Sequence, residues 1–218
     1  MDFLTDFVPT TIKPQEIENK SFSIIDQEIG EHPFDEKQYK IVQRIIHATA
    51  DFNLGKSLIF HPDAISAGIL AIQAGKNIIT DVKMIQSGIN KSRLEKYGVE
   101  VLNYISDEDV SEEAKRQQVT RSIIAMRKAV KLNEGGIYVI GNAPTALLEL
   151  IRLIKLGEAK PDLIIGLPVG FVSVAETKEE LLKITTPYIT NRIRKGGSPV
   201  VAAAVNALAI LAVNGPVK

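Results

Sequence analysis

One histidine has neighbours that could give it a chemical role. In the segment RIIHATADF, His47 follows two isoleucines and precedes Asp51 by four residues. If the helix expected here continues to Asp51, the carboxylate can reach the imidazole, because residues four apart share a helical face. That contact would favour the imidazolium form and make His47 a proton donor near neutral pH. The alternative is a surface histidine that is paired with an aspartate and has no catalytic role.

Basic side chains follow several of the predicted strands. Lys83 comes after one strand and Arg192 and Lys195 after another, while Arg121 lies on a predicted helix. Arginine grips carboxylate or phosphate with two parallel hydrogen bonds, and lysine contributes a compact charge. Any one of these charges is equally a solvated loop residue. Together, at several strand ends, they indicate a pocket that accepts anions.

The remaining chemistry is limited by residues that the chain lacks. The sequence has no cysteine, which excludes thiol catalysis, disulfides and thiolate metal sites. His32 and His61 both precede proline and are not spaced as metal ligands, so we expect no metal site. His32 is expected in a structural turn, whereas His61 ends a predicted strand and is expected near the ligand. No glycine-rich nucleotide fingerprint, P-loop or nucleophile elbow occurs.

Short apolar runs that alternate with helical segments must position these residues. We expect six strands within segments 57–60, 77–81, 99–104, 136–141, 163–168 and 188–190. This alternation predicts an α/β fold with a mostly parallel sheet of about six strands, helices on both faces and two preceding N-terminal helices. Those two helices are expected at about Pro14–Ile29 and Glu36–Ala50, and a long helix at about Glu112–Leu132. No linker or repeat is visible, so we expect one domain over 1–218.

Ligands of open parallel sheets bind beyond the carboxyl ends of the strands. The segments that follow the predicted strands are rich in Gly, Asn, Asp, Lys and Arg, as in GNAPT and NRIRKGG. Acidic and basic residues balance at 26 each, which argues against a nucleic-acid partner. The N-terminus does not resemble a signal peptide, and the apolar segment Pro199–Val213 is too short for a membrane span. We therefore expect a cytoplasmic protein without membrane partners.

Five blocks of the sequence resemble one known family. The blocks RIIHATADF, IITDVKM, GNAPTAL, PDLIIGLPVGFVSVAE and PYITNRIRKGGSPVVAAAVNAL resemble the precorrin-8X methylmutases, also called cobalt-precorrin-8 methylmutases. The resemblance extends from the helix containing IENKSFSIID to the C-terminal helix. It implies an isomerase of corrin (vitamin B12) biosynthesis, which moves a methyl group on ring C from C-11 to C-12 and yields hydrogenobyrinate or cobyrinate. It also implies a homodimer that needs no cofactor.

The same resemblance implies roles for individual residues. His47 matches the family's proton donor or acceptor, and Ser21 matches a position near the substrate. The substrate is a large flat ring with many carboxylate arms, which suits dispersed cations and hydrogen-bond donors. The substrate-binding residues that we expect are Ser21, Asp81, Lys83, Arg121, Asn142, Thr145, Asn191, Arg192 and Lys195. The residues leave two other functions open, a tetrapyrrole carrier and an enzyme for a small anionic metabolite. They do not decide whether the substrate contains cobalt.

Overall fold

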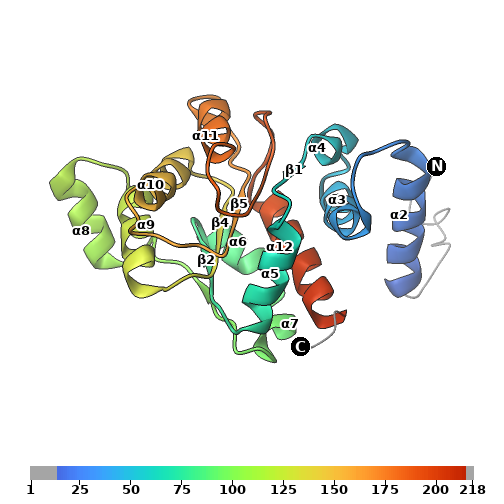
Figure 1. Cartoon of the computed structure of the whole chain (residues 1–218), viewed down its shortest axis with the longest axis horizontal. Helices are drawn as coiled ribbons and strands as arrows, with labels where there is room; N and C mark the ends of the chain where they lie inside the picture. The colour runs from blue at the N-terminus through green and yellow to red at the C-terminus, as the bar shows by residue number, and fades with distance from the viewer. Residues whose placement is uncertain (1–13, 215–218) are drawn as a thin grey trace, which may run out of the picture. The chain divides into compact units, whose positions relative to one another are not determined.

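The computed structural model describes residues 14–214, which fall into two compact units. The small unit ends at Pro33 and contains the helix α2 (Pro14–Glu28). The large unit begins at Phe34 and contains every other element labelled in Figure 1. The expectation of a single domain over 1–218 remains a prediction. The interpretation of the first ten residues as a chain start without a signal peptide concerns residues outside the described range.

A six-stranded sheet forms the centre of the large unit, in the order β1-β6-β5-β4-β2-β3. All neighbouring strands are parallel except β1, which pairs with β6 in the antiparallel direction. The strands are β1 (Ile59–Phe60), β2 (Ile78–Thr80), β3 (Val101–Leu102), β4 (Ile137–Ile140), β5 (Leu163–Gly166) and β6 (Tyr188–Thr190). The predicted α/β fold with a mostly parallel sheet of six strands is confirmed.

Helices cover both faces of this sheet (Figure 1). On one face α5 and α6 pack against α12, which also contacts α3; on the other face α9 and α11 pack against α10, and α8 packs against α9. The helices of this unit are α3 (Glu36–Thr49), α4 (Phe52–Lys56), α5 (Ala64–Gln73), α6 (Lys83–Gly88), α7 (Ser92–Glu95), α8 (Glu108–Gln117), α9 (Arg121–Leu132), α10 (Pro144–Lys155), α11 (Val174–Leu181) and α12 (Ser198–Asn214).

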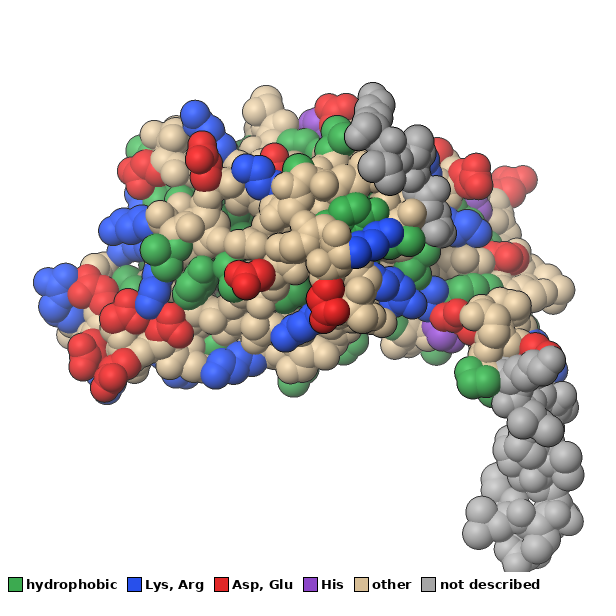
Figure 2. All heavy atoms as spheres, turned by 90° about the horizontal axis from the view of Figure 1, so that it is seen from below, with side chains coloured by type: hydrophobic (Ala, Val, Ile, Leu, Met, Phe, Trp, Pro, Cys, Tyr) green, Lys and Arg blue, Asp and Glu red, His purple; other side chains and the backbone are tan. Residues whose placement is uncertain are grey.

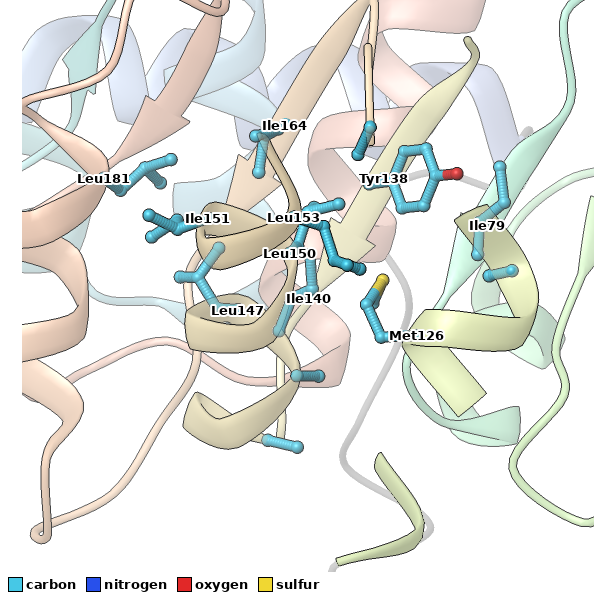
Figure 3. Close-up of a cluster of buried hydrophobic side chains, with 14 residues drawn as sticks. Ile79, Met126, Tyr138, Ile140, Leu147, Leu150, Ile151, Leu153, Ile164 and Leu181 are labelled. Carbon is cyan, nitrogen blue, oxygen red and sulfur yellow. The ribbon is translucent and has the colours of Figure 1, made fainter. Parts of the chain in front are cut away.

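Successive side chains along each central strand point to opposite faces of the sheet, so they pack against the helices on both faces. Tyr138 and Ile140 of β4 point to the same face and pack in one cluster with Met126 of α9 and Leu150 of α10 (Figure 3). All four are almost completely buried, and burial of side chains of this size stabilises a fold by about 1.5–3 kcal/mol each. The cluster fixes α9 and α10 against the sheet, and with them the loops at their N-terminal ends.

The expectation of a single long helix at Glu112–Leu132 is wrong. α8 ends at Gln117 and α9 begins at Arg121, because Gln118 adopts a left-handed conformation with φ of 54°. The N–H group of Val119 then bonds back to the carbonyl of Ala114, as at the end of many helices. Glycine usually takes this position, and a glutamine gave no sequence signal for the break.

The direction of β1 decides which residues meet at each edge of the sheet. We call the edge where the five parallel strands end the carboxyl edge. Because β1 runs against β6, its last residue lies at the opposite edge, where His61 donates its backbone N–H to Tyr188 at 2.9 Å. The expectation that His61 lies with the ends of the other strands is therefore wrong. The segment before β1, which includes α4 and the end of α3, reaches the carboxyl edge instead.

Candidate active site

His47 is exposed in the last turn of α3. Ala50 ends that helix in a left-handed conformation with φ of 51°, and the chain continues through α4 into β1. The junction between α3 and α4 lies close to the loop after β6, since Lys195 Nζ is 2.6 Å from Asp51 Oδ2. The antiparallel strand thus brings the end of a helix from outside the parallel array to the carboxyl edge, and His47 with it.

Asp51 does not continue the helix of His47. It is the N-cap of α4, and its side chain accepts a hydrogen bond from Leu54 N at 2.9 Å in addition to the one from Lys195. The hydrogen bond from Lys195, followed by the one from Leu54 N, lowers the pKa of the Asp51 carboxyl group. The condition under which Asp51 would tune His47 from the same helical face is therefore not met.

Asp81 is almost fully buried where β2 ends. Its carboxylate accepts hydrogen bonds from the backbone N–H groups of Gly141 (3.2 Å), Asn142 (2.9 Å) and Ala143 (2.7 Å) in the loop after β4. Burial raises the pKa of Asp81, and these three donors oppose that effect. Chain connections leave β2 and β4 in opposite directions along the sheet, which is where such folds place ligands. Asp81 braces the loop at this point.

The loop that Asp81 braces leads into α10. The side chain of Asn142 is exposed, and that of Thr145 accepts a hydrogen bond from Thr120 at 3.2 Å. Thr120 is the N-cap of α9, so this contact brings Arg121, the first residue of α9, to the N-terminal end of α10. Arg121 is exposed there. The structure thus brings three of the expected binding residues together.

A buried lysine holds the loop after β6 in place. Lys178 of α11 is completely buried, and its Nζ donates to Asn191 Oδ1 (2.8 Å) and to the backbone carbonyls of Ile193 (2.7 Å) and Lys195 (2.9 Å). Asn191 is also buried and donates its own amide to the Lys195 carbonyl at 3.2 Å. The amide of Asn191, an expected substrate contact, is therefore occupied within the loop.

The expected cations face solvent along the carboxyl edge. Arg192 pairs with Glu179 at 3.0 Å, and Lys195 pairs with Asp51. More than half of each of these two basic side chains is exposed, and such pairs contribute little to stability. Lys83 is exposed as the first residue of α6, directly after β2. A carboxylate group of a ligand can therefore replace Glu179 or Asp51 as the partner of these basic side chains.

Apolar side chains lie beside these cations in the loop after β5. Phe171 is 83% exposed and Val172 82% exposed, which is unusual for residues of this size. The guanidinium of Arg194 lies 5.8 Å from the centre of the Phe171 ring. The carboxyl edge therefore offers apolar and cationic groups side by side.

Ser21 belongs to α2 in the small unit. Its hydroxyl donates to the backbone carbonyl of Ile17 at 2.9 Å, and the side chain is half-buried. The other expected binding residues belong to the large unit. The expected role of Ser21 near the substrate remains a prediction.

Two features of this site were not predicted. Lys178 lies in the segment ETKEELLK, whose charges are typical of a solvated helix face, and only its spacing from Val174 and Leu181 marks it as inward-facing. Phe171 and Val172 appear in the sequence as an ordinary apolar pair, and exposure cannot be read from such a pair. On α3, Gln43 is buried one turn before His47.

Within 14–214 there is no group of three or more histidines and carboxylates that could hold a metal, and no helix is both long and apolar enough to cross a bilayer. Over α8, acidic and basic side chains are mixed on the face drawn in Figure 2. On this helix Arg116 pairs with Glu113, and Asp109 pairs with Lys128 of α9. This mixture does not form the continuous basic field of a nucleic-acid binder.

Known proteins are similar to this chain in sequence and fold, and the similarity extends over nearly the whole length of those proteins. Residues 16–211 match the family described as precorrin-8X methylmutase. The chain belongs to that family. It is therefore a methylmutase of cobalamin biosynthesis, which is an isomerase.

Several members of the methylmutase family are close to this chain. The cobalt-precorrin-8 methylmutase of Priestia megaterium is 64% identical over 99% of this chain and 96% of its own length. The precorrin-8X methylmutase of Pseudomonas aeruginosa is 40% identical over 89% and 94%. The crystal structure of the precorrin-8X methylmutase from Thermus thermophilus aligns with a TM-score of 0.86 and 43% identity, over 92% of this chain and 97% of that one.

Proposed function

We propose that this methylmutase moves a methyl group on ring C of a corrinoid from C-11 to C-12, with His47 as the acid. The substrate is precorrin-8X or cobalt-precorrin-8, and the product is hydrogenobyrinate or cobyrinate. The observation that carries this proposal is the position of His47: an exposed imidazole at the carboxyl edge, in a chain whose family performs this isomerisation.

The role of His47 follows from the balance of the reaction. Substrate and product are isomers, so a proton that is donated to the macrocycle must be returned when the new bond has formed. One imidazole performs both steps, because its protonated form donates a proton and its neutral form takes the proton back. No nucleophile is needed, since the methyl group never leaves the substrate.

The groups along the carboxyl edge suit a flat ring with anionic arms. Lys83, Arg121, Arg192 and Lys195 are our candidates for the carboxylate arms, and Asn142 and Thr145 for hydrogen bonds. We assign Asp81 and Asn191 a supporting part in substrate binding, since both are buried and hold the loops that carry these groups. Phe171 and Val172 offer an apolar surface for the face of the ring.

We further propose that the enzyme acts as a cytoplasmic homodimer, with Ser21 near the substrate. Many apolar residues of α12 are not available for a subunit contact, because they are buried, among them Val201, Ala204, Val205 and Leu208. Ile210 and Leu211, near the end of the helix, are half-buried. Light scattering over a range of protein concentrations measures the oligomeric state, and a monomer at every concentration would contradict the dimer.

The function is tested by incubating the protein with metal-free precorrin-8X and, separately, with cobalt-precorrin-8. We expect a change in the absorption spectrum for at least one of them, and carbon NMR of the product should show the methyl group on C-12. A tetrapyrrole carrier would bind the same compounds and return them unchanged. An enzyme for small metabolites would bind simple organic acids and neither corrinoid. The comparison of the two rates decides whether cobalt is preferred.

A further inference from the structure

The loop after β6 depends on a buried charge that the reaction itself does not use. We call residues 191–195 the cation loop, because Arg192, Arg194 and Lys195 lie in it. Lys178 of α11 lies under this loop with no exposed surface, and its three hydrogen bonds all end on the loop. A lysine ammonium has three donors, so each donor is used. We call these three hydrogen bonds between α11 and the cation loop the clamp.

Packing alone does not explain a lysine at this position. A buried ammonium loses its hydration, and here burial lowers the pKa of Lys178 to about 8. An apolar side chain of similar length would fill the same space without that cost. What the lysine adds is the simultaneous hold on one side-chain oxygen and two main-chain oxygens. These three contacts determine the path of the backbone between Asn191 and Lys195.

The cation loop and the two glycines that follow it, Gly196 and Gly197, are held tightly against the loop after β5. Gly197 N donates to the Leu167 carbonyl at 2.9 Å, and Gly170 N donates to the Arg194 carbonyl at 3.3 Å. At Gly196 the approach is so close that a Cβ atom would lie 2.0 Å from Leu167 O. The main chain of the loop is therefore fixed on two sides, by the clamp and by this contact, while its basic side chains face solvent.

We propose that Lys178 is a positioning residue of the methylmutase: its ammonium sets the cation loop so that Lys195 and Arg192 meet the carboxylate arms of the substrate. Lys178 itself does not touch the substrate. The proposal rests on the proposed function, since it assigns the arms to these two cations. It predicts that loss of the clamp weakens binding of the corrinoid more than it slows the chemical step, because His47 lies on a different element.

The test begins with steady-state kinetics of Lys178→Met, which keeps the length and removes the donors. The matched control is Lys183→Met, which removes an exposed lysine that pairs with Glu180 nearby. For Lys178→Met we expect KM to rise about tenfold or more while kcat falls less than about threefold. For the control we expect both within about twofold of the wild type. A fall in kcat at unchanged KM would overturn the proposal.

A double-mutant cycle separates positioning from a general loss of stability. If Lys178 acts through Lys195, the effect of Lys195→Met on KM should largely disappear when Lys178→Met is already present. Two effects that multiply independently would overturn the proposal. If Lys178→Met does not fold, Lys178→Gln, which keeps two donors, takes its place in the same cycle.

Failure of the proposed function can be recognised separately. Hydrogenobyrinate binding, followed by absorption titration, does not require turnover. A wild-type protein that binds this compound but converts no substrate would contradict the proposed reaction, while the same cycle measured on Kd would still test the clamp. We expect the changes in Kd to follow those in KM.

Discussion

The side chain of Asp51 has two partners whose contributions can be measured separately. It caps α4 through Leu54 N and pairs with Lys195 Nζ. Asparagine caps helices about as well as aspartate, so Asp51→Asn keeps the cap and removes only the ion pair. Asp51→Ala removes both. The comparison of the two variants isolates the contact that joins the segment after His47 to the cation loop.

The magnitudes follow from the exposure of the pair. The Lys195 side chain is 53% exposed and that of Asp51 26% exposed, so solvent and salt screen the attraction. We expect Asp51→Asn to lower the free energy of unfolding by about 0.5 kcal/mol, the order typical of such pairs. Loss of the cap costs about 1 kcal/mol more, so Asp51→Ala should lose about 1.5 kcal/mol in total.

The pH dependence gives a second check on the same variants. Lys195 lowers the pKa of Asp51 in the folded protein below the value in the unfolded chain. Stability from a lowered carboxyl pKa is present above the unfolded value of about 4 and is lost as the pH falls through the folded pKa. The difference between wild type and Asp51→Asn should therefore be constant from pH 7 to 5 and shrink below about pH 4.

Urea denaturation at a series of pH values, with and without added salt, measures these differences. High salt should reduce the effect of Asp51→Asn, whereas the further loss in Asp51→Ala should persist. Equal destabilisation by Asn and Ala would refute the separation into cap and ion pair. A difference from Asp51→Asn that persists unchanged at the lowest pH would refute the assignment to Lys195.

Three further outcomes test the arrangement of the carboxyl edge. Asp81→Ala leaves three backbone donors, two of them buried, without their acceptor, and we expect a loss of about 3 kcal/mol in urea denaturation; an unchanged midpoint would contradict its bracing role. Gly196→Ala places a Cβ atom against Leu167 O, so we expect about 2 kcal/mol of destabilisation and weaker corrinoid binding, and full binding would show that the two loops separate freely. Asp51→Asn should leave the alkaline limb of the pH–rate profile in place, whereas a shifted limb would restore Asp51 as a partner of His47.

Much of the sheet could be predicted because each central strand is an apolar run between turn residues. Ile137–Ile140 and Leu163–Gly166 lie within their predicted segments. The direction of β1 could not be predicted, since two residues with no periodicity carry no orientation. That one strand reverses the placement of His61 and brings the end of α3 to the carboxyl edge.

The loops that form the candidate site could be predicted from the sequence, but the roles of several of its side chains could not. Polar residues after parallel strands were expected to meet, and Asp81 and Asn142 do so across the β2–β4 switch point. Whether a polar side chain faces substrate or holds a loop depends on burial, which no local pattern gives for Asn191 or Lys178. The family resemblance identified the chemistry, and the structure shows which groups support the loops.

The most direct test of the account is the turnover of His47→Ala on the accepted corrinoid substrate, followed by absorption spectroscopy under single-turnover conditions. The control is His61→Gln, because His61 lies at the opposite edge of the sheet. We expect the rate of His47→Ala to fall by about 100-fold or more with little change in Tm, and that of His61→Gln to stay near the wild-type rate. Turnover of His47→Ala within about twofold of the wild type would contradict the assignment of His47 as the acid.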